Sequence, residues 1–429
     1  MSRHRQLRVE ALARVEGEGA LRIVVAEGRV ERAELNIYEP PRFFEAFLRG
    51  RGYTEPPDIT SRICGICPVA YQTSACNALE QACGITLDQP LAELRRLLYC
   101  AEWISSHCLH IYLLHIPDFL GYPDAIALAA DHRERVEQGL AVKKAGNTLF
   151  ELIGGRAIHP INIRVGGFYS VPEPTDFGPV TELLRRALDD AVQTARWAAG
   201  FDFPDLELDY AFLAATESDR YAITTGDVHT STGLRFPAAE FPHHVVEQQV
   251  PHSTALHATL DGERYLTGPL ARYTLNYQQL SPFARQVAAE IGLGTECRNP
   301  FRSILVRAVE VVYAIEQSLT LIADYQRPAR AAVPTEPRNA TGHGVSEAPR
   351  GLLYHRYAID DDGLVRSATI VPPTSQNQAA IEDDLRSVAS NNLELDDAAL
   401  TTLCERVIRN YDPCISCATH FLSIDRVHR

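Results

Sequence analysis

The sequence has few lysines and methionines and no long uncharged apolar run. Only Lys143 and Lys144 are lysines among 41 basic residues, a bias that we attribute to genomic base composition. No apolar stretch approaches the ~18 residues of a transmembrane helix, so no membrane span is expected. Acidic residues number 55 and the net charge is −14. This argues against a nucleic-acid or anionic-membrane surface, because phosphate binding needs a basic field.

The sequence also predicts no secretory leader. The first six residues form a basic segment with Arg3, His4 and Arg5. Leu7-Arg8-Val9-Glu10 follows this segment in place of a continuous apolar stretch. Ten cysteines without a leader predict reduced thiols, buried or metal-bound, in the cytoplasm. A metal-loaded chain can still be exported with a partner that carries the signal. At 429 residues, 45% of them hydrophobic, the chain is long enough for a deep core.

Helical periodicity dominates the chain and predicts a mainly α fold with a smaller β part (α+β). Alternating residues predict a β-hairpin or small sheet over 7–38, turning at 26–29. Residues 203–275 predict irregular β structure, and 328–351 a long Pro/Gly/Ala-rich loop with a function. We expect one domain over 1–429, a large helical bundle with peripheral N-terminal and middle β elements and a helical core at 62–200 and 276–410. Three- and four-residue spacing predicts helices at 42–48, 91–112, 124–152, 175–199, 276–292, 303–326, 376–390 and 396–410.

Two Cys-x-x-Cys pairs lie at opposite ends of the chain, Cys64/Cys67 and Cys414/Cys417. Thiolates are soft ligands, so two such pairs can supply four sulfurs to one metal. A zinc ribbon closes over roughly 15–20 residues, whereas almost the whole chain intervenes here. The spacing therefore predicts a site at the centre of a large fold. The remaining cysteines lack ligand spacing and are expected to be small buried hydrophobes: Cys76, Cys83, Cys100, Cys108, Cys297 and Cys404.

Several motifs accompany these pairs. They are Arg14-Val-Glu16-Gly, a central Gly155-Arg-Ala-Ile-His-Pro-Ile-Asn-Ile-Arg-Val-Gly-Gly167, Glu347-Ala-Pro-Arg350-Gly and Val371-Pro-Pro-Thr-Ser-Gln-Asn377. Together with the cysteine pairs they resemble the large, catalytic subunit of nickel–iron hydrogenases over the whole chain. The central motif is similar to that of the family's cytoplasmic bidirectional, NAD(P)-linked or sulfhydrogenase branch.

The resemblance implies two metal sites. Cys64 and Cys414 would be terminal nickel ligands, and Cys67 and Cys417 would bridge nickel to an iron that carries one carbonyl and two cyanides. Glu45 and His420 would hold a magnesium or iron ion together with a main-chain carbonyl near residue 370 and waters. Hard oxygen donors with retained waters suit magnesium.

The same resemblance implies roles around the nickel–iron group. Glu16 would relay a proton beside Cys414, and Arg350 would place its guanidinium over the open metal site. Asp118 and Asp412 would hold that arginine. Thr374 would hydrogen-bond a cyanide, and Pro349 belongs to the same covering loop as the arginine.

Two positions depart from the family pattern. Tyr71 stands where many relatives carry His, and a phenol cannot titrate near neutral pH. Glu18 stands where His is frequent, and it is the first alternative to Glu16 as proton relay.

The implied activity is reversible oxidation of dihydrogen to protons and electrons. The other cysteines leave no run with iron–sulfur cluster spacing, so the electrons need an iron–sulfur small subunit and, in this branch, flavin and NAD(P)-reducing subunits. A maturation protease would remove residues 421–429 once nickel is inserted. Two alternatives are a metal-free quinone-site subunit of a complex I-like assembly and a structural zinc or metal-storage protein. Metal analysis separates the three.

Overall fold

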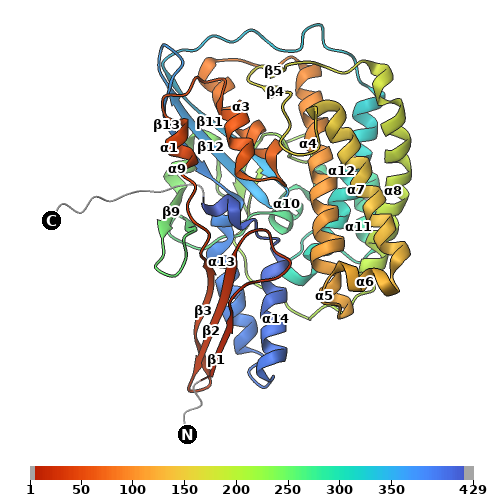
Figure 1. Ribbon diagram of the computed structural model, residues 1–429, viewed down its shortest axis with the longest axis vertical. Coiled ribbons are helices and arrows are strands. Elements are labelled where there is room, and N and C mark those ends of the chain that lie inside the picture. The colour runs from red at the N-terminus through yellow and green to blue at the C-terminus, as the bar shows by residue number, and fades with distance from the viewer. Residues whose placement is uncertain (1–4, 420–429) are drawn as a thin grey trace, which may run out of the picture.

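A computed structural model describes residues 5–419 of the chain (Figure 1). His420 and the predicted removable tail at 421–429 therefore lie outside the described residues. Helices predominate, and five small antiparallel sheets lie beside them, in agreement with the predicted α+β class. Within the described range, no helix is both long and apolar enough to cross a membrane.

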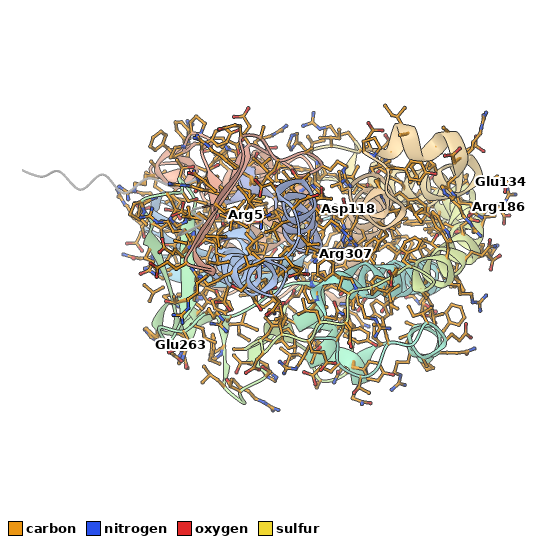
Figure 2. All side chains as sticks on the ribbon, turned by 90° about the horizontal axis from the view of Figure 1, so that it is seen from below. Arg5, Asp118, Glu134, Arg186, Glu263 and Arg307 are labelled. Atoms are coloured by element: carbon orange, nitrogen blue, oxygen red, sulfur yellow. The ribbon has the colours of Figure 1, made fainter. Side chains whose placement is uncertain are left out.

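Four long helices pack side by side to form a bundle (Figure 1). They are α4 (Gln89–Leu109), α7 (Arg133–Gly154), α8 (Gly178–Ala199) and α12 (Ser303–Ala323). α12 is apolar around most of its circumference and is buried over its first thirteen residues, as a central helix must be. The ribbon with side chains places Glu134 and Arg186 at the outer edge of this bundle, whereas Asp118 and Arg307 lie toward the middle of the molecule (Figure 2).

The prediction of a single helix over 124–152 was wrong. Its residues form α6 (Ala125–Asp131), capped by the side chain of Asp124, and then α7. The break falls at His132, whose backbone leaves the helical region at φ −124 and ψ 39. The His132 ring packs against Tyr122 and Trp197. This tertiary packing holds the break in a stretch that has helical spacing. α4, in contrast, continues through a π-helical turn at His110–His115 into α5 (Ile116–Leu120).

The N-terminal sheet confirms the predicted hairpin. β2 (Gly19–Ala26) pairs with β3 (Arg29–Ile37), and β1 (Arg5–Val9) adds to the other edge of β2. The turn residues Glu27 and Gly28 both have positive φ, the conformation of a tight hairpin turn. The sheet packs on α13 (Pro373–Ser390), with α14 (Asp397–Asn410) beside it (Figure 1).

The middle segment is the predicted irregular β structure, with two short helices in it. Its strands are β6 (Leu213–Thr216), β7 (Asp227–Thr230), β8 (Arg235–Phe236), β9 (Val245–Gln249) and β10 (Leu256–Leu260), and α9 (Phe241–His244) precedes β9. The helix predicted over 276–292 is the shorter α11 (Pro282–Glu290), and α10 (Pro269–Asn276) lies before it, within the segment predicted as irregular β structure. Pro269 and Pro282 each stand in the first turn of their helix, where proline is tolerated.

A three-stranded sheet at 340–371 was not predicted. β11 (Ala340–Ala348), β12 (Gly351–Ile359) and β13 (Val365–Val371) lie within the expected loop at 328–351 and the expected helical core at 276–410, so both assignments were wrong there. β11 packs on α3 (Pro68–Cys83) so closely that a Cβ at Gly342 would lie 1.8 Å from the Ala78 carbonyl oxygen. The glycines of β11 therefore permit close packing and do not mark a turn.

Short elements complete the fold. α1 (Phe44–Leu48) and α2 (Pro56–Thr60) lead into the first cysteine pair, and β4 (Ile163–Arg164) pairs with β5 (Gly167–Phe168). α3 then starts directly after Cys67.

Candidate metal centre

The two cysteine pairs meet in one buried cluster. The sulfur of Cys414 lies 3.2 Å from that of Cys64 and 2.9 Å from that of Cys417, and Cys67 and Cys417 are 3.7 Å apart. None of these four cysteines forms a disulfide, and their side chains are at least 97% buried. A disulfide has an S–S distance near 2.05 Å, so these sulfurs are not oxidised pairs. The four sulfurs all lie within 4.8 Å of one another, which suits a shared metal.

Local backbone structure presents the first pair. Cys64 follows a 3-10 turn at Ser61–Ile63, and its sulfur accepts a hydrogen bond from the Ile66 N–H at 3.3 Å. Cys67 is the N-cap of α3, followed by Pro68 in the first turn. The Cys-x-x-Cys spacing thus places both sulfurs around the start of one helix.

The second pair is held by two distant segments. The Cys414 N–H donates to the Thr374 Oγ1 at 3.1 Å, and the Ile415 N–H donates to the Glu16 carbonyl at 3.0 Å. Cys417 lies in a 3-10 turn at Ile415–Thr419. The first turn of α13 and the N-terminal motif therefore fix the position of the second pair.

Electrostatics show that the cluster suits a cation. Hydrogen bonds from Cys414 and the other thiols lower the pKa of Cys64, while burial and the neighbouring sulfurs raise the pKa of Cys414. Burial acts against the charged form of all four thiols, so four thiolates cannot coexist here without compensating positive charge. A metal ion supplies that charge, and the residues present therefore fit a thiolate-bound metal.

Glu16 lies directly beside the cluster. Its Oε2 accepts hydrogen bonds from the Cys414 thiol and from the Ser416 N–H, both at 3.1 Å. Burial, and then the nearby Cys64, raise the pKa of this carboxyl group. Glu18, the alternative relay, is exposed. The structure therefore places Glu16, and not Glu18, where a proton can pass to or from a cysteine sulfur.

Arg350 is buried next to the sulfurs and paired with Asp412. Its Nε donates to the Asp412 carbonyl at 2.7 Å and its Nη2 to Oδ1 at 2.9 Å. Its Nη1 has no hydrogen-bond partner among the described residues, and neither does the Asp412 Oδ2. A buried guanidinium nitrogen without a partner suits an anionic ligand at this point.

Asp118 does not hold Arg350, so that part of the prediction was wrong. Its carboxylate binds Arg409 through two hydrogen bonds of 2.7 and 2.9 Å and also pairs with Arg14. These contacts lower the pKa of Asp118 against the opposing effect of burial. Asp118 thus anchors the N-terminal motif to the helix before the second cysteine pair.

Buried ion pairs missed by the sequence analysis support the loop that carries Arg350. Arg272 forms two hydrogen bonds to Glu310 at 2.8 and 2.9 Å and one to Glu347 at 2.9 Å. It also donates to the carbonyl oxygens of Ala348 and Pro349. Arg272 therefore holds the covering loop at 347–351 in place through these hydrogen bonds. An arginine in the predicted β insert offered no sequence signal for this role.

A second missed residue is Glu102, which is 1% exposed on α4. Its Oε2 accepts from the Val69 N–H at 2.6 Å and its Oε1 from the Ala70 N–H at 3.1 Å. The carboxylate thereby satisfies two donors at the start of α3, beside Cys67. The sequence offered no clear signal for this role, because α4 also carries Glu93, Arg95 and Arg96.

Tyr71 is fully buried, and burial and the charges of Cys417 and Cys67 raise its pKa. Its ring meets that of His355 edge to face, with centroids 5.6 Å apart. The phenol remains protonated here, in agreement with the prediction that it cannot titrate near neutral pH.

The predicted second metal site is described only in part. The Oε1 of Glu45 accepts from the Ile370 N–H at 2.7 Å, and burial raises the pKa of Glu45 to about 7. Glu247, which was not predicted, is half-buried nearby, and burial raises its pKa to about 8, with a further contribution from Glu45. Two half-buried carboxyl groups can neutralise a hard cation. The other predicted ligand, His420, lies outside the described residues.

The other six cysteines stay apart from the cluster. Five are buried, and Cys83 is half-buried. Burial raises the pKa of Cys76 and Cys404 to about 12. Their prediction as small buried hydrophobes is confirmed for all but the half-buried Cys83.

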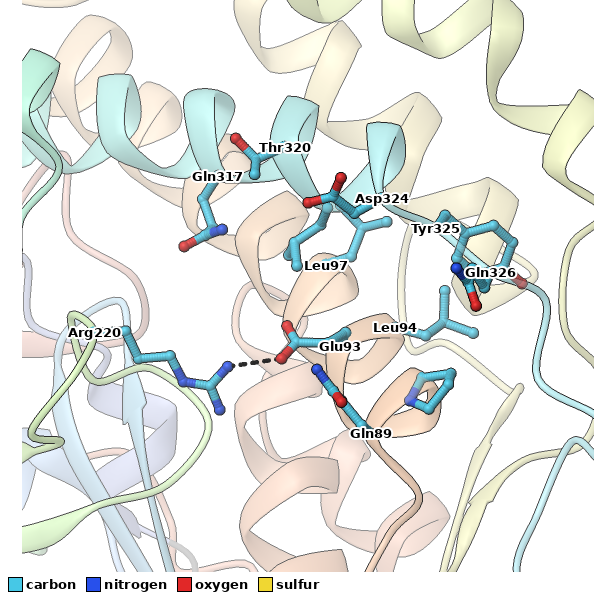
Figure 3. A pocket seen from close by; sticks show the side chains of 12 residues that line it. Gln89, Glu93, Leu94, Leu97, Arg220, Gln317, Thr320, Asp324, Tyr325 and Gln326 are labelled. Atoms are coloured by element: carbon cyan, nitrogen blue, oxygen red, sulfur yellow. Dashed lines mark hydrogen bonds and ion pairs between the residues drawn. The ribbon is translucent and has the colours of Figure 1, made fainter.

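A surface pocket of about 460 Å³ between the ends of α4 and α12 is a separate feature (Figure 3). Polar side chains line much of it, and Arg220 donates to Glu93 across it at 3.0 Å. None of the four clustered cysteines lines it, so this pocket is not the metal centre.

Known proteins are similar to this chain in sequence and in fold. The family model described as nickel-dependent hydrogenase matches residues 42–156 and 228–420. Sulfhydrogenase 1 subunit alpha of Pyrococcus furiosus is 34% identical over 424 residues, which cover 97% of this chain and 98% of that protein. The NAD-reducing hydrogenase HoxS subunit beta of Cupriavidus necator is 28% identical over 97% of this chain and 95% of that subunit.

A solved structure is similar to this chain in fold. The crystal structure of an NAD⁺-reducing [NiFe]-hydrogenase in the H₂-reduced state superimposes with a TM-score of 0.87 and 27% identity, covering 97% of this chain and 99% of that chain. The residues that the family model matches include both cysteine pairs and the loops around them. The chain therefore belongs to the nickel-dependent hydrogenase family.

Proposed function

We propose that the chain is the catalytic subunit of a nickel–iron hydrogenase, which interconverts dihydrogen with protons and electrons. The observation that carries the proposal is the Glu16 carboxylate, 3.1 Å from the sulfur of Cys414 within a buried cluster of four cysteine sulfurs. Such a cluster can hold metal, and a carboxyl group of raised pKa beside it can exchange protons with it.

Cys64 and Cys414 would bind nickel alone, and Cys67 and Cys417 would bridge it to an iron that carries one carbonyl and two cyanides. When bound, this group supplies the Lewis-acid and redox chemistry that cleaves dihydrogen. Two donors support the diatomic ligands. The Arg350 Nη1 is buried without a hydrogen-bond partner within residues 5–419, and the Thr374 hydroxyl, which accepts from the Cys414 N–H, has its own proton to donate elsewhere.

Proton transfer would run between the Cys414 sulfur and Glu16. The hydrogen bond already joins the two atoms, so a proton moves along it without rearrangement of the chain. Burial raises the pKa of Glu16, which makes the carboxyl group a better proton acceptor than an exposed glutamate. Arg350, held in place by Asp412, would keep its guanidinium charge beside the cluster during this exchange.

A second ion, magnesium or iron, would bind Glu45, His420 and the carbonyl of residue 370. The half-buried pair Glu45 and Glu247 supports a cation at this place. The nine residues after His420 would be removed by a maturation protease. Intact-mass measurement of the active protein tests this, because a chain that still ends at Arg429 would contradict processing.

Electrons would leave through an iron–sulfur small subunit and then through flavin subunits that reduce NAD(P), in the cytoplasm. Within residues 5–419, the only cysteine group that could hold a metal is the four-sulfur cluster. The electron path must therefore continue in another chain. The likeness to an NAD-reducing hydrogenase supports the proposed acceptor.

The test is metal and activity analysis of the purified complex. We expect nickel and iron in the chain, infrared bands of carbonyl and cyanide, and hydrogen-dependent reduction of a viologen dye and of NAD⁺ or NADP⁺. A metal-free chain would favour the complex I-like alternative, and a chain with zinc in place of nickel and iron would favour a structural metal protein. Dye reduction without pyridine nucleotide reduction would retain the hydrogenase and reject the acceptor.

A further inference from the structure

A second cluster of metal-binding side chains lies outside the four-sulfur centre. His252, His257 and Glu382 each offer a ligand atom, and these atoms all lie within 4.8 Å of one another. His252 precedes β10 and His257 lies on it, whereas Glu382 lies on α13. Eight residues of helix separate Glu382 from Thr374, or about 12 Å at the rise of an α-helix. The cluster is thus distinct from the cysteine site.

His257 is the fixed member of this group. Its side chain is 4% exposed, and its Nε2 is buried without a hydrogen-bond partner among the described residues. An unpaired buried ring nitrogen is costly unless something binds it. Burial, and then the neighbouring His252, lower the pKa of His257 to about 4. The ring is therefore neutral at physiological pH and can donate a lone pair to a metal.

The other two members can adjust to an ion. The Nε2 of His252 and the Oε1 of Glu382 are 2.7 Å apart, and their side chains are 23% and 15% exposed. Ligand atoms of a tetrahedral zinc ion lie about 3.4 Å apart, given bonds near 2.05 Å. Side-chain rotation is enough to increase the distance between these two atoms to that of two zinc ligands. Solvent can reach this side of the cluster, so water can complete the coordination.

The backbone around the cluster is fixed independently of any ion. The Thr254 N–H donates to the Ile37 carbonyl at 2.7 Å, and the Gln249 side chain donates to the Ser253 carbonyl at 2.7 Å. The Glu382 Oε1 also accepts from the Leu35 N–H at 3.0 Å. Three elements, β3, the β9–β10 hairpin and α13, therefore converge on the same point and preorganise the ligands.

We propose that His252, His257 and Glu382 form an additional metal site that binds a divalent transition ion of the zinc type. Two imidazoles and one carboxylate are a ligand set that zinc accepts, with a water in the fourth position. Carboxylate-rich, imidazole-free sites suit magnesium and calcium instead. The ion ties the β9–β10 hairpin to α13, whose first turn contacts Cys414 through Thr374.

Elemental analysis of the assembled complex tests the site without reference to hydrogenase activity. We expect about one zinc per catalytic chain that is lost in His257→Gln and in the more exposed His252→Gln, since removal of a direct ligand weakens binding beyond the roughly 10- to 100-fold of an indirect one. His243→Gln, an exposed histidine in the same segment, should keep the zinc. Anomalous diffraction at the zinc edge should place the ion between His257 and Glu382.

Three outcomes would overturn the proposal. The first is a wild-type complex that contains no zinc-type ion and takes none up on dialysis against zinc chloride. The second is unchanged zinc content in folded His252→Gln protein. The third is an anomalous peak only at other positions. Loss of nickel and iron with retained zinc would concern the cysteine cluster alone, so failure of the proposed function and failure of this site are distinguishable.

Discussion

The Glu16 Oε2 accepts a hydrogen bond from the Cys414 thiol at 3.1 Å, although 398 residues separate the two side chains. The same oxygen accepts from the Ser416 N–H at 3.1 Å, and the Glu16 carbonyl accepts from the Ile415 N–H. The N-terminal motif thus both positions the last cysteine pair and offers it a proton acceptor.

Glu16→Gln should keep the metals but lose proton exchange. An amide can replace the hydrogen bond to Ser416 but cannot carry a proton onward, so isotope exchange between deuterium gas and water should fall by about 10²- to 10⁴-fold. Mass spectrometry of the gas phase measures the exchange, and elemental analysis checks the metals. The matched control is Glu18→Gln, an exposed acid two residues away, which should exchange at the parental rate. Parental exchange in Glu16→Gln would move the relay elsewhere.

Cys414→Ser should lower nickel content and abolish hydrogen uptake. An alcohol is a harder and far less ionised ligand than a thiolate. Nickel per chain and dye reduction are the measurements. Cys83→Ser is the control, because Cys83 is half-buried and outside the cluster, and this variant should retain both. Normal nickel in Cys414→Ser would remove Cys414 from the ligand set.

Arg350→Lys should keep nickel and iron while turnover falls about 10²- to 10³-fold, the usual effect of losing a preorganised donor at an active site. An ammonium retains the charge but cannot bond the Asp412 carbonyl and carboxylate together as Nε and Nη2 do. Arg264→Lys, at a half-exposed ion pair with Asp383, should behave as the parent. Parental turnover in Arg350→Lys would mean that only the positive charge matters.

Glu102→Ala should destabilise the start of α3. It leaves the Val69 and Ala70 N–H groups buried without acceptors, at a cost of about 1–3 kcal/mol each. The thermal midpoint should drop, and nickel content should fall with it because Cys67 adjoins these residues. Glu102→Gln keeps one acceptor and should lie between parent and Ala. Glu93→Ala, at a partly exposed ion pair on the same helix, should change the midpoint little.

The buried histidines His110 and His115 should make the protein sensitive to mild acid. Burial is the largest cause that lowers the pKa of both, and their tilted rings have centroids 4.8 Å apart. Unfolded histidine titrates near 6.5. Below that pH the unfolded chain binds protons that the folded chain excludes, so stability falls as pH falls, by about 1.4 kcal/mol per pH unit for each ring.

Thermal midpoints between pH 7.5 and 5 test this. His115→Gln can still donate a hydrogen bond to the Asn410 side chain, which His115 contacts at 2.9 Å, and should show a shallower loss on acidification. His243→Gln, an exposed control, should follow the parent. Equal slopes in His115→Gln and the parent would assign the acid sensitivity to other groups.

The sequence by itself determined the cysteine chemistry, the predominance of helix and the N-terminal hairpin. Each depends on local pattern: paired thiols two residues apart, apolar residues at helical spacing, and a Glu-Gly turn between alternating strands. Those signals survive folding because they arise between residues close in the chain. The family resemblance extended the prediction to Glu16, Arg350 and Thr374, which the structure brings to the same cluster.

Only the tertiary structure decided which charges pair. Asp118 meets Arg409 and Arg14 in place of Arg350, and Glu102 meets the start of α3, because packing of remote helices sets these distances. The sheet at 340–371 was not predicted, because its glycines are typical of a loop. In the structure, the close contact between β11 and α3 requires these glycines. The cluster of His252, His257 and Glu382 joins a hairpin to a helix 125 residues further along, and no local pattern in the sequence encodes such a meeting.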